Sequence, residues 1–255
     1  MASSSKLIPM QKLLPSAITV TSLCLGITSI KYSLDGNYRI AVGLVLLAAF
    51  LDGVDGRVAR FLNSTSNFGA QLDSLSDMCC FGVSPAVMMY LWSLHKIPYE
   101  GAGWALTLFY VTCSALRLAR FNTSVIDDQN SEFKQCKNRE NYFFQGLPMP
   151  AAAILLLMPV MLTFSFLEHN SFNGLALFLG AYLLIISFLM VSQVPIYSGK
   201  NINITKEKAK FLLVFVGILF TSAILEPWVL IPLLSLCYIV TILVNIIMLR
   251  KVLRP

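Results

Sequence analysis

The chain has 255 residues, of which 56% are hydrophobic and 13% charged, and its mean hydropathy is +0.72. A soluble domain carries about 25% charged residues, so this composition excludes an ordinary soluble globular protein. The net charge is +6, but the basic residues are spread over several segments, which argues against a nucleic-acid-binding protein.

The hydrophobic residues fall into blocks close to the ~20 residues that a helix needs to cross a bilayer. The blocks are continuous rather than alternating, which favours helices over a transmembrane barrel. In chain order we expect eight spans, at about 15–34, 38–60, 68–92, 101–121, 147–167, 172–192, 210–226 and 228–249. The longest polar connections are 122–146 and 193–209. The sequence therefore predicts an all-α, polytopic transmembrane helical bundle.

The positions of the Lys and Arg residues predict the orientation of this bundle. If the N-terminus lies inside, all of the 19 Lys and Arg except Lys31, Arg39 and Lys96 fall on the inner side. Lys and Arg concentrate in the cytoplasmic loops of membrane proteins, so we expect both termini in the cytoplasm. Attraction to anionic membrane lipids is a second consequence of the same charges.

Four aspartates lie toward the cytoplasmic ends of the second and third predicted spans. An ionised carboxylate at membrane depth is costly and usually marks a polar site. On a helix Asp52 and Asp55 share one face, and Asp73 and Asp77 share one face of the next helix. The short connection 63–67 makes these helices antiparallel neighbours. We therefore expect the two pairs of carboxylates to face each other near one membrane surface.

Small residues accompany the aspartates on both helices. Gly56 and Ala59 share the face of Asp55, and Gly69 lies one turn before Asp73. These positions leave room for a bulky ligand between the helices, although small residues also favour close helix packing. Arg60 ends the first face, where it is placed to reach a phosphate oxygen.

The charge of the four carboxylates indicates the chemistry. They cannot all stay ionised in an apolar setting unless cations share the site. Carboxylate oxygens suit hard divalent cations, so we expect Mg²⁺ or Mn²⁺, with two ions per site. A carboxylate-held metal pair is typical of phosphoryl transfer.

Two other readings of the aspartates remain. A single intramembrane aspartate can be a structural hydrogen-bonding group, and paired carboxylates can line the path of a divalent-metal or proton-coupled transporter. Against a transporter, the aspartates gather near one membrane face, and no paired broken-helix repeats are visible.

The aspartates and small residues follow a known signature. The spacing D52-x2-D55-G56-x2-A59-R60-x8-G69-x3-D73-x3-D77 resembles that of the CDP-alcohol phosphatidyltransferases at every fixed position. The resemblance implies that Asp52, Asp55 and Asp73 hold metal and the CDP diphosphate. It implies that Asp77 shares in metal binding and is the base that activates the acceptor hydroxyl. Four more positions would lie along the CDP moiety: Gly56, Ala59, Arg60 and Gly69.

Further segments bear on the acceptor alcohol. The stretches D77-M-C-C-F-G-V-S-P-A86, A115-L-R-L-A-R-F-N122 and G146-L-P-M-P-A-A-A153 resemble the phosphatidylserine synthase branch of the family. This resemblance implies transfer of a phosphatidyl group from CDP-diacylglycerol to L-serine, giving phosphatidylserine and CMP. The alternative is the same chemistry with choline, inositol phosphate or glycerol 3-phosphate as acceptor.

Serine carries a carboxylate and an ammonium group, so its pocket needs charged partners. Arg117 and Arg120 lie about one turn apart at the cytoplasmic end of the fourth span, and they are candidates to bind the serine carboxylate or a lipid-linked phosphate. The alternative is that both are interfacial anchors. Ser84 is a third candidate because it continues the face of Asp73 and Asp77, with a helix kink at Ser84–Pro85 as its alternative.

We predict one membrane domain over residues 1–255, with a catalytic core at 12–125 and further transmembrane helices at 147–255. The family resemblance implies a homodimer. We expect the protein in a bacterial cytoplasmic membrane, with the active site facing the cytoplasm.

Overall fold

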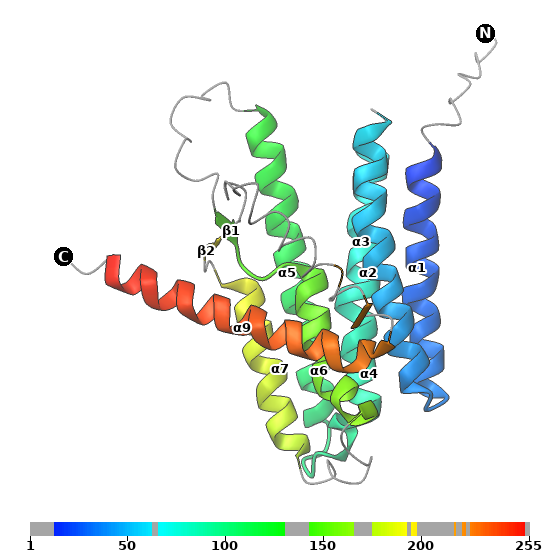
Figure 1. The fold of residues 1–255 in the computed structure, drawn as a ribbon, viewed down its shortest axis with the longest axis vertical. Coiled ribbons are helices and arrows are strands. Elements are labelled where there is room, and N and C mark those ends of the chain that lie inside the picture. The colour runs from blue at the N-terminus through cyan, green and yellow to red at the C-terminus, as the bar shows by residue number, and fades with distance from the viewer. Residues whose placement is uncertain are drawn as a thin grey trace.

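The computed structural model describes residues 13–62, 66–130, 143–165, 175–192, 195–197, 217, 221–222 and 225–252. Within these ranges the chain forms a helical bundle with one pair of very short strands (Figure 1). The prediction of an all-α bundle is confirmed. The seventh predicted span, 210–226, lies mostly outside the described residues.

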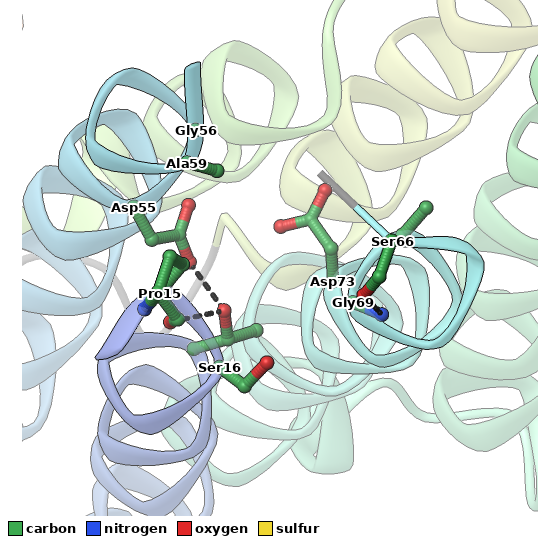
Figure 2. A pocket seen from close by; sticks show the side chains of 10 residues that line it. Pro15, Ser16, Asp55, Gly56, Ala59, Ser66, Gly69 and Asp73 are labelled. Atoms are coloured by element: carbon green, nitrogen blue, oxygen red, sulfur yellow. Dashed lines mark hydrogen bonds between the residues drawn. The ribbon is translucent and has the colours of Figure 1, made fainter. Parts of the chain in front are cut away.

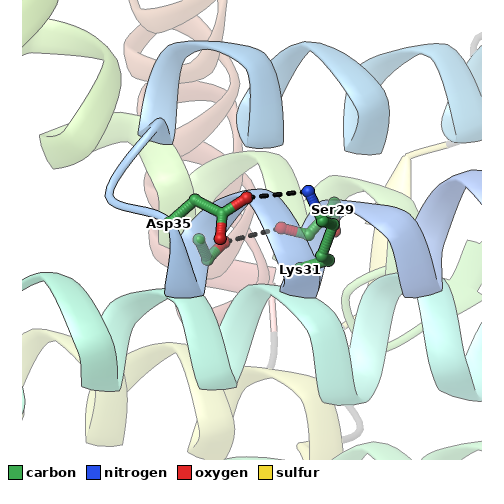
Figure 3. Close-up of polar contacts among 4 residues, drawn as sticks. Ser29, Lys31 and Asp35 are labelled. Carbon is green, nitrogen blue, oxygen red and sulfur yellow. Dashed lines mark hydrogen bonds and ion pairs between the residues drawn. The ribbon is translucent and has the colours of Figure 1, made fainter.

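The bundle begins with a hairpin of two long helices, α1 (Leu13–Leu34) and α2 (Tyr38–Phe61), which pack along each other. The turn between them contains Gly36 at φ +76°, a backbone conformation that glycine adopts without strain. Lys31 and Asp35 form an ion pair of 2.9 Å at the end of α1 (Figure 3). This pair is exposed and adds little stability, so the packing of α1 along α2 is the main contact that holds the hairpin together.

The third predicted span is one continuous run of helix with a change of pitch. Helix α3 (Asn67–Asp77) leads into a π-helical segment, η2 (Met78–Val83), and then into α4 (Ser84–Trp92). Ser66 caps α3, because its hydroxyl accepts a hydrogen bond of 3.0 Å from the backbone N–H of Gly69. The π-helical segment follows Asp77 directly, and such segments often occur at functional sites.

The prediction that Ser84 continues the face of Asp73 and Asp77 assumes a regular α-helix, and η2 interrupts that helix between Asp77 and Ser84. A regular α-helix would carry Ser84 onto the face of Asp73 and Asp77, but the wider π-helical turn rotates everything beyond it. Ser84 is fully buried and shares a hydrogen bond with Ser29 of α1. Its hydroxyl thus joins α4 to α1, and Ser84 does not line the pocket that Asp55 and Asp73 border.

Helix α5 (Ala102–Asn130) follows the short 3₁₀ turn η3 (Leu94–Lys96) and is longer than predicted. We expected a polar connection from residue 122, and this is wrong for 122–130. That stretch contains neither glycine nor proline, so the helix continues past its apolar part.

The C-terminal half begins with two apolar helices, α6 (Met149–Ser165) and α7 (Ala176–Val191). Strand β1 (Phe143–Gln145), which precedes α6, pairs antiparallel with β2 (Pro195–Tyr197), which follows α7. Neither strand was anticipated. The last helix, α9 (Pro227–Val252), packs on α6 and runs across the other helices in Figure 1, where it is orange to red.

Three helical runs among the described residues are long and apolar enough to cross a membrane: Leu14–Leu34, Asn67–Trp92 and Ala102–Thr123. Shorter apolar helices lie at Met149–Ser165, Ala176–Val191 and Pro227–Thr241. Helix α2 has sufficient length but carries several charged residues near its C-terminal end. The count of eight spans therefore stays a prediction.

Candidate active site

Three of the four aspartates converge in the structure. Asp52 and Asp55 come from the last turns of α2, and Asp73 comes from α3. One carboxylate oxygen of each lies within 4.8 Å of those of the other two. Asp55 is only 4% exposed, while Asp52 and Asp73 are half-buried. The facing arrangement expected from helix periodicity is thus present for these three residues.

Asp77 lies next to this trio rather than within it. Its carboxyl group is in hydrogen-bonding range of that of Asp52. Its other oxygen, Oδ1, is buried and has no hydrogen-bond partner among the described residues. A buried carboxylate oxygen without a partner is energetically unfavourable, so this atom has free capacity for a cation or a hydroxyl proton.

A pocket of about 160 Å³ opens beside the aspartates, between α1, α2 and α3. Figure 2 shows Asp55 and Asp73 on opposite walls of this pocket. Its lining residues are Pro15, Ser16, Thr19, Asp55, Gly56, Ala59, Ser66, Gly69, Ala70 and Asp73. At Gly56 a side chain would meet nothing within 4 Å, so the pocket is open there. The predicted positions Gly56, Ala59 and Gly69 therefore do border free space beside the carboxylates.

Helix α1 contributes a wall that the sequence analysis did not assign to the site. Thr19 is buried, and its hydroxyl donates a hydrogen bond of 2.7 Å to Oδ2 of Asp55. The Pro15 carbonyl lies 3.1 Å from the same hydroxyl. The sequence offered no clear signal, because Thr19 is one of several Ser and Thr residues in α1. Only the packing of α1 on α2 shows which residue Thr19 meets.

Two of the predicted arginines are held by backbone carbonyls. Arg60 is exposed, and its Nε donates a hydrogen bond of 3.0 Å to the Gly56 carbonyl one turn earlier on α2. Arg120 is exposed, and its guanidinium donates to the Val191 carbonyl at the end of α7, at 2.9 Å. Neither lines the pocket between α1, α2 and α3.

Arg117 differs from these two arginines. It is half-buried, and its Nε is buried without a hydrogen-bond partner among the described residues. Its charge lies close enough to Asp77 for the two side chains to attract each other. Of the three acceptor-side candidates, Arg117 is therefore the one that the fold brings to the aspartates.

The donor set fits a divalent cation. Carboxylate oxygens are the ligands that Mg²⁺ and Mn²⁺ prefer, and three of them lie close together with the free Oδ1 of Asp77 nearby. Four acidic groups packed this closely also require positive charge if they are to remain ionised.

Comparison with known proteins identifies the family of the chain. Residues 12–191 match the family model for CDP-alcohol phosphatidyltransferase, and the chain belongs to this family. It is 37% identical to a CDP-diacylglycerol–serine O-phosphatidyltransferase of Mycobacterium tuberculosis, over 89% of this chain and 76% of that protein. It is 35% identical to a protein of the same name from Helicobacter pylori, over 82% of this chain and 81% of that protein.

A relative that matches a smaller part of the chain has a similar name. The chain is 33% identical to an archaetidylserine synthase of Methanothermobacter thermautotrophicus, over 56% of this chain and 55% of that protein. This relative comes from an archaeon, whereas the two relatives above come from bacteria.

Proposed function

We propose that the protein transfers a phosphatidyl group from CDP-diacylglycerol to the hydroxyl of L-serine, giving phosphatidylserine and CMP. The observation that carries this proposal is the similarity to relatives named for this reaction over more than four-fifths of the chain. The acidic cluster beside an open pocket supports the same chemistry.

In this proposal Asp52, Asp55, Asp73 and Asp77 hold two divalent cations, Mg²⁺ or Mn²⁺. When bound, these ions neutralise the diphosphate of the substrate and stabilise charge on the attacking and leaving oxygens. The CDP moiety occupies the pocket between α1, α2 and α3, along Gly56, Ala59 and Gly69. Arg60 reaches the nucleotide after it exchanges its hydrogen bond to the Gly56 carbonyl for a phosphate oxygen.

Asp77 acts on the acceptor. As the serine hydroxyl oxygen attacks the phosphorus attached to diacylglycerol, the hydroxyl proton passes to Asp77. A new P–O bond forms to serine, the bridging P–O bond of the diphosphate breaks, and CMP leaves with the bonding electron pair. A carboxylate is a weak base for an aliphatic hydroxyl, so charge stabilisation must supply much of the acceleration.

We also propose a homodimer in a bacterial cytoplasmic membrane, with the aspartates facing the cytoplasm. The family resemblance supports the dimer, and the distribution of Lys and Arg supports the orientation. Chemical cross-linking of the protein in its native membrane tests the dimer, and a single species of monomer mass would contradict it.

The direct test of the function is a panel of acceptors with purified protein and CDP-diacylglycerol. We expect CMP release with L-serine and little with choline, inositol phosphate or glycerol 3-phosphate. If CMP release depends on one of the other alcohols instead, that alcohol is the acceptor and the assignment of serine is wrong. Metal flux into liposomes without any CMP release would instead support a transporter.

A further inference from the structure

The proposed function does not say how an amino-acid acceptor is recognised. The pocket between α1, α2 and α3 is bordered by Asp55 and Asp73, and we assign it to the nucleotide. Recognition of the acceptor must therefore lie on another side of Asp77, and α5 is the helix that approaches from there.

Contacts above and below Asp77 fix the position of α5. On one side the Ser74 hydroxyl accepts a hydrogen bond of 3.2 Å from the side-chain amide of Asn122. On the other side a Cβ at Gly82 would lie 3.2 Å from the Cβ of Ser114. The pairing of 74 with 122 and of 82 with 114 makes the two segments antiparallel. Asp77 lies between the two contacts on one segment, and position 117 lies between them on the other.

A third contact holds the same register. Tyr110 is fully buried, and its hydroxyl donates a hydrogen bond of 3.2 Å to the carbonyl of Phe81 in η2. Arg117 lies two turns after Tyr110 and so shares its helix face. In this register position 117 lies opposite residue 79 in η2, close to Asp77, and the charges of Arg117 and Asp77 attract each other.

The chemical state of Arg117 points to a missing anion. An arginine that only anchors the helix at the membrane surface would extend its guanidinium to water, but the Nε of Arg117 is buried. This Nε has no hydrogen-bond partner within the described part of the chain. A buried N–H group is stable only with a hydrogen-bonding partner, and the planar donors of an arginine match a carboxylate. Asp77 is nearby, but its Oδ1 is also without a partner, so these two buried atoms do not satisfy each other.

We propose that Arg117 determines acceptor specificity by binding the carboxylate of the amino-acid acceptor, which places the acceptor hydroxyl at Asp77. The geometry suits serine, since only a few bonds separate its hydroxyl from its carboxylate, and Asp77 and Arg117 are neighbours. Tyr238 of α9 lies within electrostatic range of Arg117 and borders the same region. This inference rests on the proposed function.

The test compares acceptors with and without the carboxylate. Wild-type protein and Arg117→Gln are assayed for CMP release with L-serine and with ethanolamine, which is serine without its carboxylate. We expect Arg117→Gln to lower kcat/KM for serine by about 10- to 100-fold, the range for losing a charge-assisted hydrogen bond. The loss falls mainly on the KM for serine. The rate with ethanolamine and the KM for CDP-diacylglycerol stay within about twofold.

If ethanolamine reacts too slowly to be compared with serine, inhibition by L-alanine tests the same carboxylate contact. L-Alanine keeps the carboxylate and ammonium of serine but has no hydroxyl, so it should inhibit the wild-type protein competitively with serine. This inhibition should disappear in Arg117→Gln. As a matched variant, Arg120→Gln should keep both the preference for serine and the inhibition by alanine, because Arg120 is bound to the Val191 carbonyl.

Three results distinguish a failure of this inference from a failure of the proposed function. Equal losses with serine and ethanolamine in Arg117→Gln would overturn the inference and indicate a role in folding or catalysis. A raised KM for CDP-diacylglycerol with unchanged serine preference would also overturn it and assign Arg117 to the lipid-linked phosphate. If wild-type protein releases no CMP with serine, the proposed function itself fails.

Discussion

At the residue scale, the four aspartates have different surroundings. Asp55 is buried and fixed by Thr19, whereas Asp77 contacts Asp52 with one oxygen and keeps the other without a partner. This difference agrees with the separate roles proposed for Asp55 as a metal ligand and for Asp77 as the base. Asp55 is a ligand held in one orientation, and Asp77 has an oxygen available for the acceptor proton.

Replacing Asp77 by Asn should abolish the base while keeping the shape of the side chain. We expect Asp77→Asn to lower kcat for CMP release by about 100- to 10,000-fold, the range for losing a general base. Asp35→Asn, in the exposed turn after α1, is the matched control and should keep wild-type turnover. Near-normal turnover of Asp77→Asn would show that Asp77 is not the base.

Thr19 should act through Asp55 rather than on the substrate. Thr19→Val removes the hydroxyl at nearly constant volume, and Asp55 then loses its 2.7 Å hydrogen bond. We expect the divalent cation concentration for half-maximal CMP release to rise by about 10- to 100-fold, as is typical when a partner of a metal ligand is lost. Thr19→Ser should restore the wild-type value. An unchanged metal requirement in Thr19→Val would show that the hydrogen bond does not orient Asp55.

At the element scale, the site depends on close packing of α1 against η2. A Cβ at Gly26 of α1 would lie 2.5 Å from Sγ and 3.0 Å from Cα of Cys80. Ser22 and Ser76 also lie at this contact, where the Ser22 carbonyl accepts from Cys80 Sγ at 3.3 Å and Ser76 donates to the Thr19 carbonyl at 3.3 Å. Small residues let the two backbones approach closely enough for these bonds.

Gly26→Ala should therefore destabilise the protein although it is remote from the pocket. We expect a loss of about 1–3 kcal/mol, as for overpacking of a well-packed core, measured as a lower thermal unfolding midpoint in detergent. Gly53→Ala on α2 is the control, because a Cβ there meets nothing within 4 Å. Equal unfolding midpoints for the two variants would contradict the close contact at Cys80.

The sequence predicted those features that depend on local periodicity. The helices of the first four spans and the facing of Asp52, Asp55 and Asp73 follow from the 3.6-residue repeat and a short connection. The position of Ser84 did not follow, because the π-helical turn after Asp77 changes the phase of the helix. The partners of Thr19 and Arg120 are tertiary contacts, with α2 and with the end of α7, and periodicity carries no information about them.

At the scale of the whole molecule, Asp73 lies near the start of the helical run from α3 to α4, and η3 follows its other end. From Asp73 to Tyr90 this run rises about 25 Å, at 1.5 Å per residue, which is most of the ~30 Å hydrocarbon core. The two ends should therefore meet opposite sides of the membrane.

Single cysteines introduced into a cysteine-free protein test this orientation in intact cells. A membrane-impermeant maleimide should label Glu100→Cys, which lies in the exposed turn before α5, without lysis. Arg57→Cys, exposed on α2 near the aspartates, should be labelled only after lysis. The reverse pattern would place the active site outside the cytoplasm.

The central claim is that acidic side chains of α2 and α3 jointly bind divalent cations for phosphatidyl transfer. Titration of purified protein with Mn²⁺, followed by electron paramagnetic resonance in the presence of CDP-diacylglycerol, measures this binding directly. We predict two bound ions per chain in the wild-type protein and loss of binding in both Asp55→Asn and Asp73→Asn, one variant from each helix. Unchanged Mn²⁺ binding in either variant, or none in the wild-type protein at saturating substrate, would contradict the account.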